Sequence, residues 1–111
     1  MINLSPATRI FVALAPVDMR QGFNGLSIRV QAVLAQDPLQ GHLYVFSNRR
    51  HNRLKILYFD GSGLWICAKR LERGVFSWPQ GEGSAVSFGS AELAALLSGL
   101  EIQAKAGWYR R

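Results

Sequence analysis

The sequence is short of the residues that build disulfide-stabilised and membrane-spanning proteins. Its single cysteine, Cys67, cannot form a disulfide within the chain, which fits a reducing compartment. No stretch approaches the roughly 18 uninterrupted apolar residues of a membrane span. The N-terminal segment MINLSPATRIFVALAPVD has no basic region before its short apolar run, so nothing in it indicates export. We therefore expect a cytoplasmic protein that does not enter a membrane.

Residues that support catalysis or bind metals and cofactors are also sparse. Cys67, His42 and His51 lack the paired ligands at short spacing that a zinc site requires. The glycines of QGEGSAVSFGS lack the lysine of a phosphate-binding P-loop. A nuclease-like divalent metal would need carboxylates, and the available ones follow no spacing motif. They are Asp18, Asp60 and Glu72. We expect no enzyme activity, no metal and no cofactor.

Positive charge is abundant, and it is concentrated in one part of the chain. The net charge is +6, from 13 basic and 7 acidic residues. Residues 49–73 hold seven basic and two acidic residues, which is +5, so the other 86 positions contribute only +1. A charge this local attracts a polyanion over a Debye length, about 8 Å at physiological salt. The seven basic residues are Arg49, Arg50, Arg53, Lys55, Lys69, Arg70 and Arg73.

The N-terminal part of the chain is typical of a strand followed by a helix. The run RIFVALAP indicates the strand. In VDMRQGFNGLSIRVQAVLAQDP the apolar residues recur at alternating spacings of four and three, the period of one helix face. We expect Asp18 to be the N-cap of this helix and Pro38 to end it. The alternative is a turn followed by a helix that begins at Asn24.

Two glycines within this segment predict a docking surface. Each glycine in a helix interior costs about 1 kcal/mol relative to alanine, so their presence needs a reason. Together with Arg29 they fall on one side at spacings of three and four. A helix side without side chains lets another backbone approach closely. The residues expected to contact a partner protein are Arg20, Gly22, Gly25 and Arg29.

The middle of the chain changes to the period of strands. Three apolar runs, HLYVFSN, RLKILYFD and GLWICAKR, are separated by RRHN and GSG, which predicts an antiparallel meander. Next come a glycine-rich loop with a short strand, GVFSWPQGEGSAVSF, and a helix, SAELAALLSG. Ser90 is the expected N-cap of that helix and Gly99 its terminator. The tail, residues 100–111, is expected to add a last strand.

These elements predict the fold class and the placement of the charges. We expect residues 1–111 to form one small α+β domain with an antiparallel meander and two helices. Because the three strands run up, down and up, residues 49–53 and 69–73 should meet at one end of the sheet. With GSG as a three-residue loop, Lys55 faces Lys69 and Leu54 faces Arg70. Opposed like charges are destabilising unless an anion such as phosphate lies between them. The alternative is a hydrated hairpin end whose lysines discourage aggregation.

Several motifs together resemble a known family. VDMR followed by a Gly-Phe pair, FSNRR, LKIL, DGSGLW, KRLERG and WP occur in the order and spacing of the TnpB accessory proteins of the bacterial insertion-sequence family numbered sixty-six. The resemblance covers about residues 7–101. These proteins share only a name with the RNA-guided nuclease called TnpB.

The resemblance implies a small protein that promotes transposition without catalytic residues of its own. Its expected partners are DNA, at the element ends or the target, a separate transposase and another accessory protein encoded by the element. Two hypotheses follow. In the first, the seven basic residues neutralise DNA phosphates. In the second, the protein is an adaptor that docks on the transposase through VDMRQGFNGL, with its basic patch against an acidic protein surface.

Overall fold

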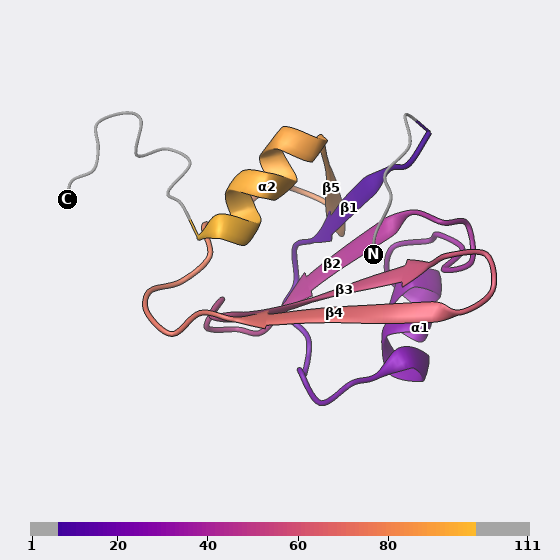
Figure 1. The fold of residues 1–111 in the computed structure, drawn as a ribbon, viewed down its shortest axis with the longest axis horizontal. Coiled ribbons are helices and arrows are strands. Elements are labelled where there is room, and N and C mark those ends of the chain that lie inside the picture. The colour runs from indigo at the N-terminus through magenta and orange to yellow at the C-terminus, as the bar shows by residue number, and fades with distance from the viewer. Residues whose placement is uncertain (1–6, 100–111) are drawn as a thin grey trace.

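The computed structural model describes residues 7–99, which form a five-stranded sheet with one helix on each face (Figure 1). The strand order is β4-β3-β2-β1-β5, and only the β1–β2 pair is parallel. The α+β fold class is therefore confirmed. Among the described residues no helix is both long and apolar enough to span a membrane. The elements are β1 (Ile10–Ala13), α1 (Phe23–Ala32), β2 (Leu43–Ser47), β3 (Arg53–Phe59), β4 (Leu64–Arg70), β5 (Ala85–Phe88) and α2 (Ser90–Ser98).

The sheet separates two apolar cores. One core lies between the sheet and α2 and contains Val12, Val45 and Leu96, while the other lies between the sheet and α1 and contains Leu26 and Tyr44. Strand β2 is buried along its whole length because it contributes side chains to both cores. This explains why LYVFS is a nearly continuous apolar run without the alternation of a half-exposed strand.

The meander of β2, β3 and β4 is confirmed, but the sequence did not predict how β1 joins it. Ile10 pairs with Leu43 in parallel, and β5 pairs with β1 in the antiparallel direction. Helix α1 connects β1 to β2, which is the crossover that a parallel strand pair requires. The last strand expected in residues 100–111 lies outside the described residues.

The expected start and end of α1 were wrong, and the alternative with an initial turn is closer to the structure. The helix begins at Phe23, with Gly22 as its N-cap. Asp18 instead organises a turn, because its Oδ1 accepts the backbone N–H of Arg20 at 2.8 Å. The helix ends at Ala32, well before Pro38. Ala35 adopts a left-handed φ of 55°, which no helix can continue through.

Helix α2 follows the prediction more closely. It begins at Ser90, but its N-cap is Gly89 and not Ser90. The carboxylate of Glu92 reaches back and accepts the backbone N–H of Gly89 at 2.7 Å. Gly99 ends the helix in the left-handed region, at a φ of 78°, as the sequence indicated. Leu93 and Leu96 are buried under the helix, which anchors it to the sheet.

The predicted register of the β3–β4 hairpin was wrong by one residue. Phe59 pairs with Leu64, so the loop has four residues, 60–63, instead of three. Asp60 belongs to this loop because its side chain organises it: Oδ1 accepts the backbone N–H groups of Ser62 and Gly63, each at 2.9 Å. A shift of one residue moves a side chain to the other face of the sheet.

The corrected register changes which basic residues face each other. Arg53 lies opposite Arg70, Leu54 opposite Lys69, and Lys55 opposite Ala68. Leu54 belongs to the α2 core, so Lys69 lies on the α2 face and Lys55 on the α1 face. The expected Lys55–Lys69 opposition does not exist, and an Arg53–Arg70 opposition takes its place.

The Asp60 loop predicts a pH dependence of stability. Donors from Trp65, Ser62 and Gly63 hold the pKa of the Asp60 carboxyl well below its usual value of 3.8. Because the folded pKa is lower than the unfolded one, the stabilisation is present above about pH 4 and is lost as the pH falls below it. Thermal unfolding at pH 7 and pH 3 should show a smaller acid-induced drop in melting temperature for Asp60→Asn than for the parent protein.

Glu82→Gln is the matched control, because Glu82 is an exposed carboxylate elsewhere on the surface. The melting temperature of Glu82→Gln should fall between pH 7 and pH 3 by as much as that of the parent protein. An equal acid-induced drop in parent and Asp60→Asn would show that the loop carboxylate does not contribute.

Candidate nucleic-acid interface

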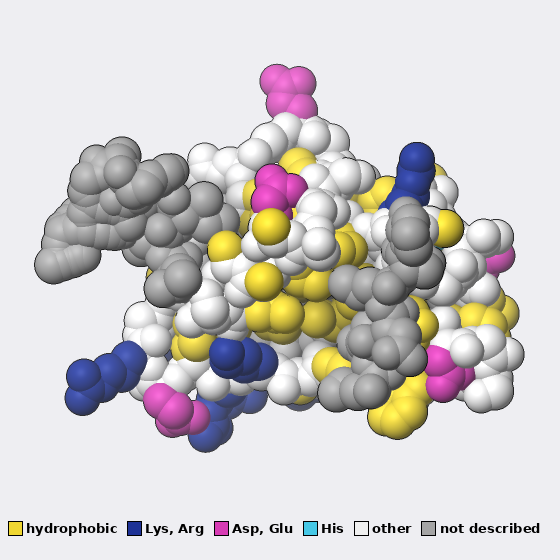
Figure 2. Space-filling model, turned by 45° about the horizontal axis from the view of Figure 1, so that its top comes forward, with side chains coloured by type: hydrophobic (Ala, Val, Ile, Leu, Met, Phe, Trp, Pro, Cys, Tyr) yellow, Lys and Arg dark blue, Asp and Glu magenta, His cyan; other side chains and the backbone are white. Residues whose placement is uncertain are grey.

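The two basic segments meet at one end of the sheet, as the meander predicted. The backbone N–H of Leu71 donates to the Asn52 carbonyl at 2.9 Å, and that of Phe76 donates to the His51 carbonyl at 2.7 Å. Residues 69–73 are therefore bound directly to the turn before β3. Figure 2 shows dark-blue side chains gathered at this end of the molecule, with an acidic side chain among them. We call residues 49–53 and 69–73 the basic end.

The turn between β2 and β3 has a fixed backbone. The Oδ1 of Asn48 accepts the N–H groups of Asn52 at 3.1 Å and Arg53 at 3.2 Å. The Nδ2 of Asn48 also donates to the Asn52 side chain at 2.7 Å. This side-chain network explains why FSNRRHN forms a tight turn. It leaves Arg49 and Arg50 exposed at the tip on a backbone that is already ordered.

His51 occupies an unusual position in the same turn. Its φ is 57°, in the left-handed region that residues with a side chain rarely adopt. Its Nδ1 is hydrogen-bonded to the buried Oγ of Ser47 at 2.6 Å. Its ring stacks on Trp78 with centroids 5.4 Å apart and planes 8° apart. Burial lowers the pKa of His51 below its usual 6.5. No motif in the sequence links His51 to Trp78, and the zinc role weighed for His51 does not predict this pair.

Three of the seven predicted basic residues already have partners within the chain. Lys55 Nζ donates to the carbonyls of Met19 at 2.7 Å and Gln21 at 3.0 Å. Lys69 Nζ donates to the Leu97 carbonyl, near the C-terminus of α2, at 2.6 Å. A cation there also complements the helix dipole. The third is Arg70, whose exposed guanidinium pairs with Glu72 at 3.1 Å.

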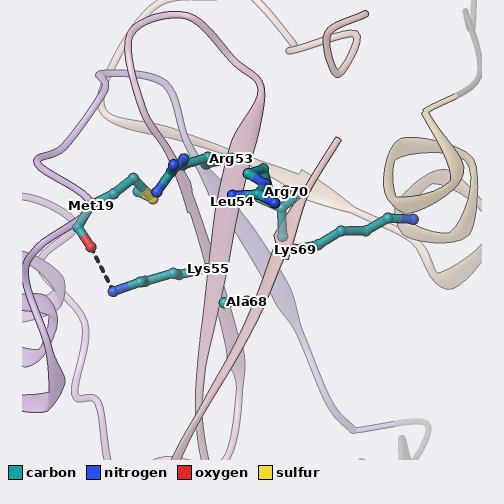
Figure 3. A pocket seen from close by; sticks show the side chains of 7 residues that line it. All are labelled: Met19, Arg53, Leu54, Lys55, Ala68, Lys69 and Arg70. Atoms are coloured by element: carbon teal, nitrogen blue, oxygen red, sulfur yellow. Dashed lines mark hydrogen bonds between the residues drawn. The ribbon is translucent and has the colours of Figure 1, made fainter. Parts of the chain in front are cut away.

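Arg53 and Arg70 share a cavity on the α1 face. They are directly opposed across β3 and β4, and with Met19, Lys55 and Ala68 they line a space of about 230 Å³. Figure 3 shows the Arg53 side chain extending toward Met19, while Lys55 and Lys69 point in opposite directions. Two opposed cations repel each other, and an anion between them removes that repulsion.

The remaining basic residues of the basic end have no acidic partner. Within residues 7–99 the ion pairs are Arg20–Asp18 and Arg70–Glu72. Four exposed arginines of the basic end take part in neither ion pair and can bind an external anion. They are Arg49, Arg50, Arg53 and Arg73.

The segment expected to dock on a partner lies beside the basic end, because Lys55 binds its backbone. Arg20 is 91% exposed and forms a bidentate pair with Asp18, which lowers the pKa of that carboxyl to about 2. Gly22 is exposed with open space above it. Gly25 differs, because a Cβ there would lie 3.1 Å from the Cβ of Gln21. Its missing side chain makes room for packing within the chain.

Arg29 lies in the last turn of α1 and is only half-buried. The four residues predicted to contact a partner therefore do not share one open surface. Arg20 and Gly22 are exposed beside the basic end, while Gly25 is covered by Gln21.

The three carboxylates considered for a metal are separated in the structure. Asp60 lies in the 60–63 loop, at the opposite end of the hairpin from Glu72. Asp18 is paired with Arg20. No group of three or more metal-binding side chains occurs in residues 7–99.

Comparison with known proteins places the chain in a family. A family model described as "IS66 Orf2 like protein" matches residues 8–107. An uncharacterized protein of Sinorhizobium fredii (strain NBRC 101917 / NGR234), y4hO, is 45% identical over 101 residues, which cover 91% of this chain and 88% of that protein. A second one from the same strain, y4jC, is 41% identical over 91% of this chain and 86% of its own length. No solved structure matches. The chain therefore belongs to the IS66 Orf2-like family, the proteins accessory to insertion-sequence transposition that its motifs had indicated.

Proposed function

We propose that this transposition accessory protein binds the phosphate backbone of nucleic acid with its basic end, and so helps to hold DNA for a separate transposase. The observation that carries the proposal is the opposition of Arg53 and Arg70 across a cavity of about 230 Å³. A phosphate in this cavity accepts charge-assisted hydrogen bonds from both guanidinium groups and removes their repulsion. The protein needs no catalytic group for this role, and it acts in the cytoplasm, where the element DNA is.

The ordered turn supports the proposal over a merely hydrated hairpin end. A hairpin that only resists aggregation needs charge but no fixed geometry. Here the Asn48 side chain fixes the turn that carries Arg49 and Arg50 through two hydrogen bonds to backbone N–H groups and one to the Asn52 side chain. A backbone ordered in advance loses less entropy when its side chains bind a ligand.

The adaptor function remains a second candidate because of the start of α1. Phe23 is 49% exposed there, next to the open Gly22 and the exposed Arg20. Lys55 holds this segment in place through two backbone carbonyls. An apolar ring on a fixed backbone suits contact with a protein, and the transposase is the expected partner.

Salt dependence of binding separates the two functions. Contact with about five phosphates gives a slope of log affinity against log salt near −4.5 on duplex DNA. We expect this slope for labelled element ends and for unrelated duplex, measured by fluorescence anisotropy with the purified protein. Binding to the transposase alone, with no measurable DNA binding at low salt, would instead support the adaptor.

A further inference from the structure

A second cavity is lined in part by His51, which belongs to the arginine-bearing turn, residues 48–53. It has a volume of about 430 Å³ and is lined by Leu14, His51, Trp78, Pro79, Gln80 and Gly81. Ligand sites in proteins are typically about 300 to 1,000 Å³, and the volume of this cavity falls in that range. This cavity has two aromatic rings and one side-chain amide. We call it the aromatic cavity.

The aromatic wall is held rigidly. Trp78 Nε1 donates to the Ala13 carbonyl at 2.8 Å, which fixes the indole against β1. His51 is fixed by Ser47, by the Trp78 ring and by the N–H of Phe76 on its carbonyl. Its positive φ is maintained by these contacts, and such backbone conformations are concentrated at functional sites. The His51 and Trp78 rings are therefore already ordered, so little side-chain entropy is lost when a planar ligand binds against them.

The aromatic cavity and the basic end belong to the same turn. His51 lines the aromatic cavity, and Arg53, two residues later, lines the cavity shared with Arg70. Two residues of extended chain span at most about 7 Å. Arg50 directly precedes His51 and is exposed. Phosphates on the basic end and a ring in the aromatic cavity can thus belong to neighbouring nucleotides of one strand.

We propose that the aromatic cavity binds one unpaired nucleobase of a strand whose phosphates lie on the basic end. The inference rests on the proposed nucleic-acid binding and specifies the form of nucleic acid. Bases within a duplex are stacked and out of reach, so the ligand is a single strand or a frayed end. Aromatic side chains stack on any base, and the Gln80 amide offers both a donor and an acceptor to its edge. The lowered pKa of His51 keeps its ring neutral at pH 7.

The test narrows the cavity by a substitution outside its two aromatic residues. A Cβ on Gly81 would lie 3.5 Å from Val86 and 3.8 Å from Leu14, which are ordinary contact distances. Gly81 lines the cavity, so we expect the larger side chain of Gly81→Leu to narrow it. Gly63→Leu is the matched control, since Gly63 is in the 60–63 loop with no atom within 4 Å of its added Cβ. Neither glycine has a positive φ.

Three labelled probes of equal length are used: a 12-nucleotide strand, the same strand with abasic sites in place of its bases, and the paired duplex. Base stacking contributes about 1–3 kcal/mol, so we expect Gly81→Leu to weaken binding of the natural strand at least fivefold. Binding of the abasic strand and of the duplex should not change, and Gly63→Leu should match the parent throughout.

A second comparison keeps the inference testable if Gly81→Leu fails to fold. The parent protein should bind the natural strand at least about fivefold more tightly than the abasic strand, and Gln80→Ala should reduce that preference. Equal binding of natural and abasic strands, or equal weakening of both by Gly81→Leu, would overturn the nucleobase site. A parent protein that binds none of the probes would instead overturn the proposed function itself.

Discussion

The largest loss of DNA binding is expected when the four arginines of the basic end that have no acidic partner are changed to glutamine, namely Arg49, Arg50, Arg53 and Arg73. Each lost phosphate contact lowers the salt slope on duplex DNA by about 0.9, so the slope should fall by about 3.6. At 0.1 M salt the affinity should fall on the order of 100-fold or more. The loss should be similar for element ends and unrelated duplex, because phosphates carry no sequence information.

The fold of this variant should be unaffected. Exposed substitutions usually change stability by less than about 0.5 kcal/mol. Removing the charge of Arg53 also relieves its repulsion with Arg70, its cross-strand neighbour. The melting temperature should therefore stay close to that of the parent while binding is lost.

A charge-matched comparison separates a local site from general positive charge. The double variant Arg49→Gln/Arg50→Gln should weaken binding much more than Arg9→Gln/Arg29→Gln, although both lose two charges. Equal weakening would mean that net charge alone attracts DNA. If the fourfold variant binds as tightly as the parent, the basic end is not the DNA surface, and the adaptor function becomes the better explanation.

The meander could be predicted from sequence because its evidence is local. The sequence contains three apolar runs separated by two short turn segments, which indicates that each strand pairs with the next one in antiparallel fashion. This pairing brings residues 49–53 and 69–73 to one end of the sheet. The parallel pairing of Ile10 with Leu43 has no such local signal. It depends on where α1 packs, which is a tertiary outcome.

The roles of the two lysines could not be predicted, because they depend on a single residue in the register. Counting Asp60 as part of β3 placed Lys55 and Lys69 face to face. Its side chain instead accepts three hydrogen bonds within the 60–63 loop and one from Trp65. The resulting shift moves the lysines to opposite faces of the sheet, where Lys55 donates to two backbone carbonyls and Lys69 to one.

The aromatic cavity was missed for a different reason. His51 and Trp78 are distant in sequence, and their stacking follows from the bond that joins Phe76 to the His51 carbonyl. A glycine often indicates a left-handed backbone conformation in a sequence, but the left-handed residue here is a histidine, so the sequence does not indicate it. The sequence does show that His51 follows Arg49 and Arg50 in RRHN, and so that it lies near the predicted phosphate-binding residues.

The largest loss of stability is expected from Lys55→Met, which keeps the length of the side chain and removes its ammonium group. Two charge-assisted hydrogen bonds to the Met19 and Gln21 carbonyls are lost at a half-buried position. Bonds to charged groups contribute about 1.5–3 kcal/mol each, and water replaces part of this, so we expect about 2–4 kcal/mol. In a domain of this size the melting temperature should fall by roughly 10 °C or more.

Lys69→Met is the control, because it removes the same charge but only one hydrogen bond, at an exposed position. It should lower the melting temperature by much less. Amide hydrogen exchange should show faster opening of residues 17–22 in Lys55→Met only, since that segment loses its attachment to β3. Equal destabilisation by the two variants would contradict the structural role of Lys55.

DNA binding by Lys55→Met then distinguishes structure from contact. An ammonium group already bound to two carbonyls has little capacity left for a phosphate, so the salt slope should stay that of the parent at temperatures where the variant is folded. A slope lower by about 0.9 with unchanged stability would show instead that Lys55 contacts a phosphate. In that case Lys55 acts as a third phosphate-binding cation in the cavity that it lines with Arg53 and Arg70, and the VDMR segment is held by its own turn alone.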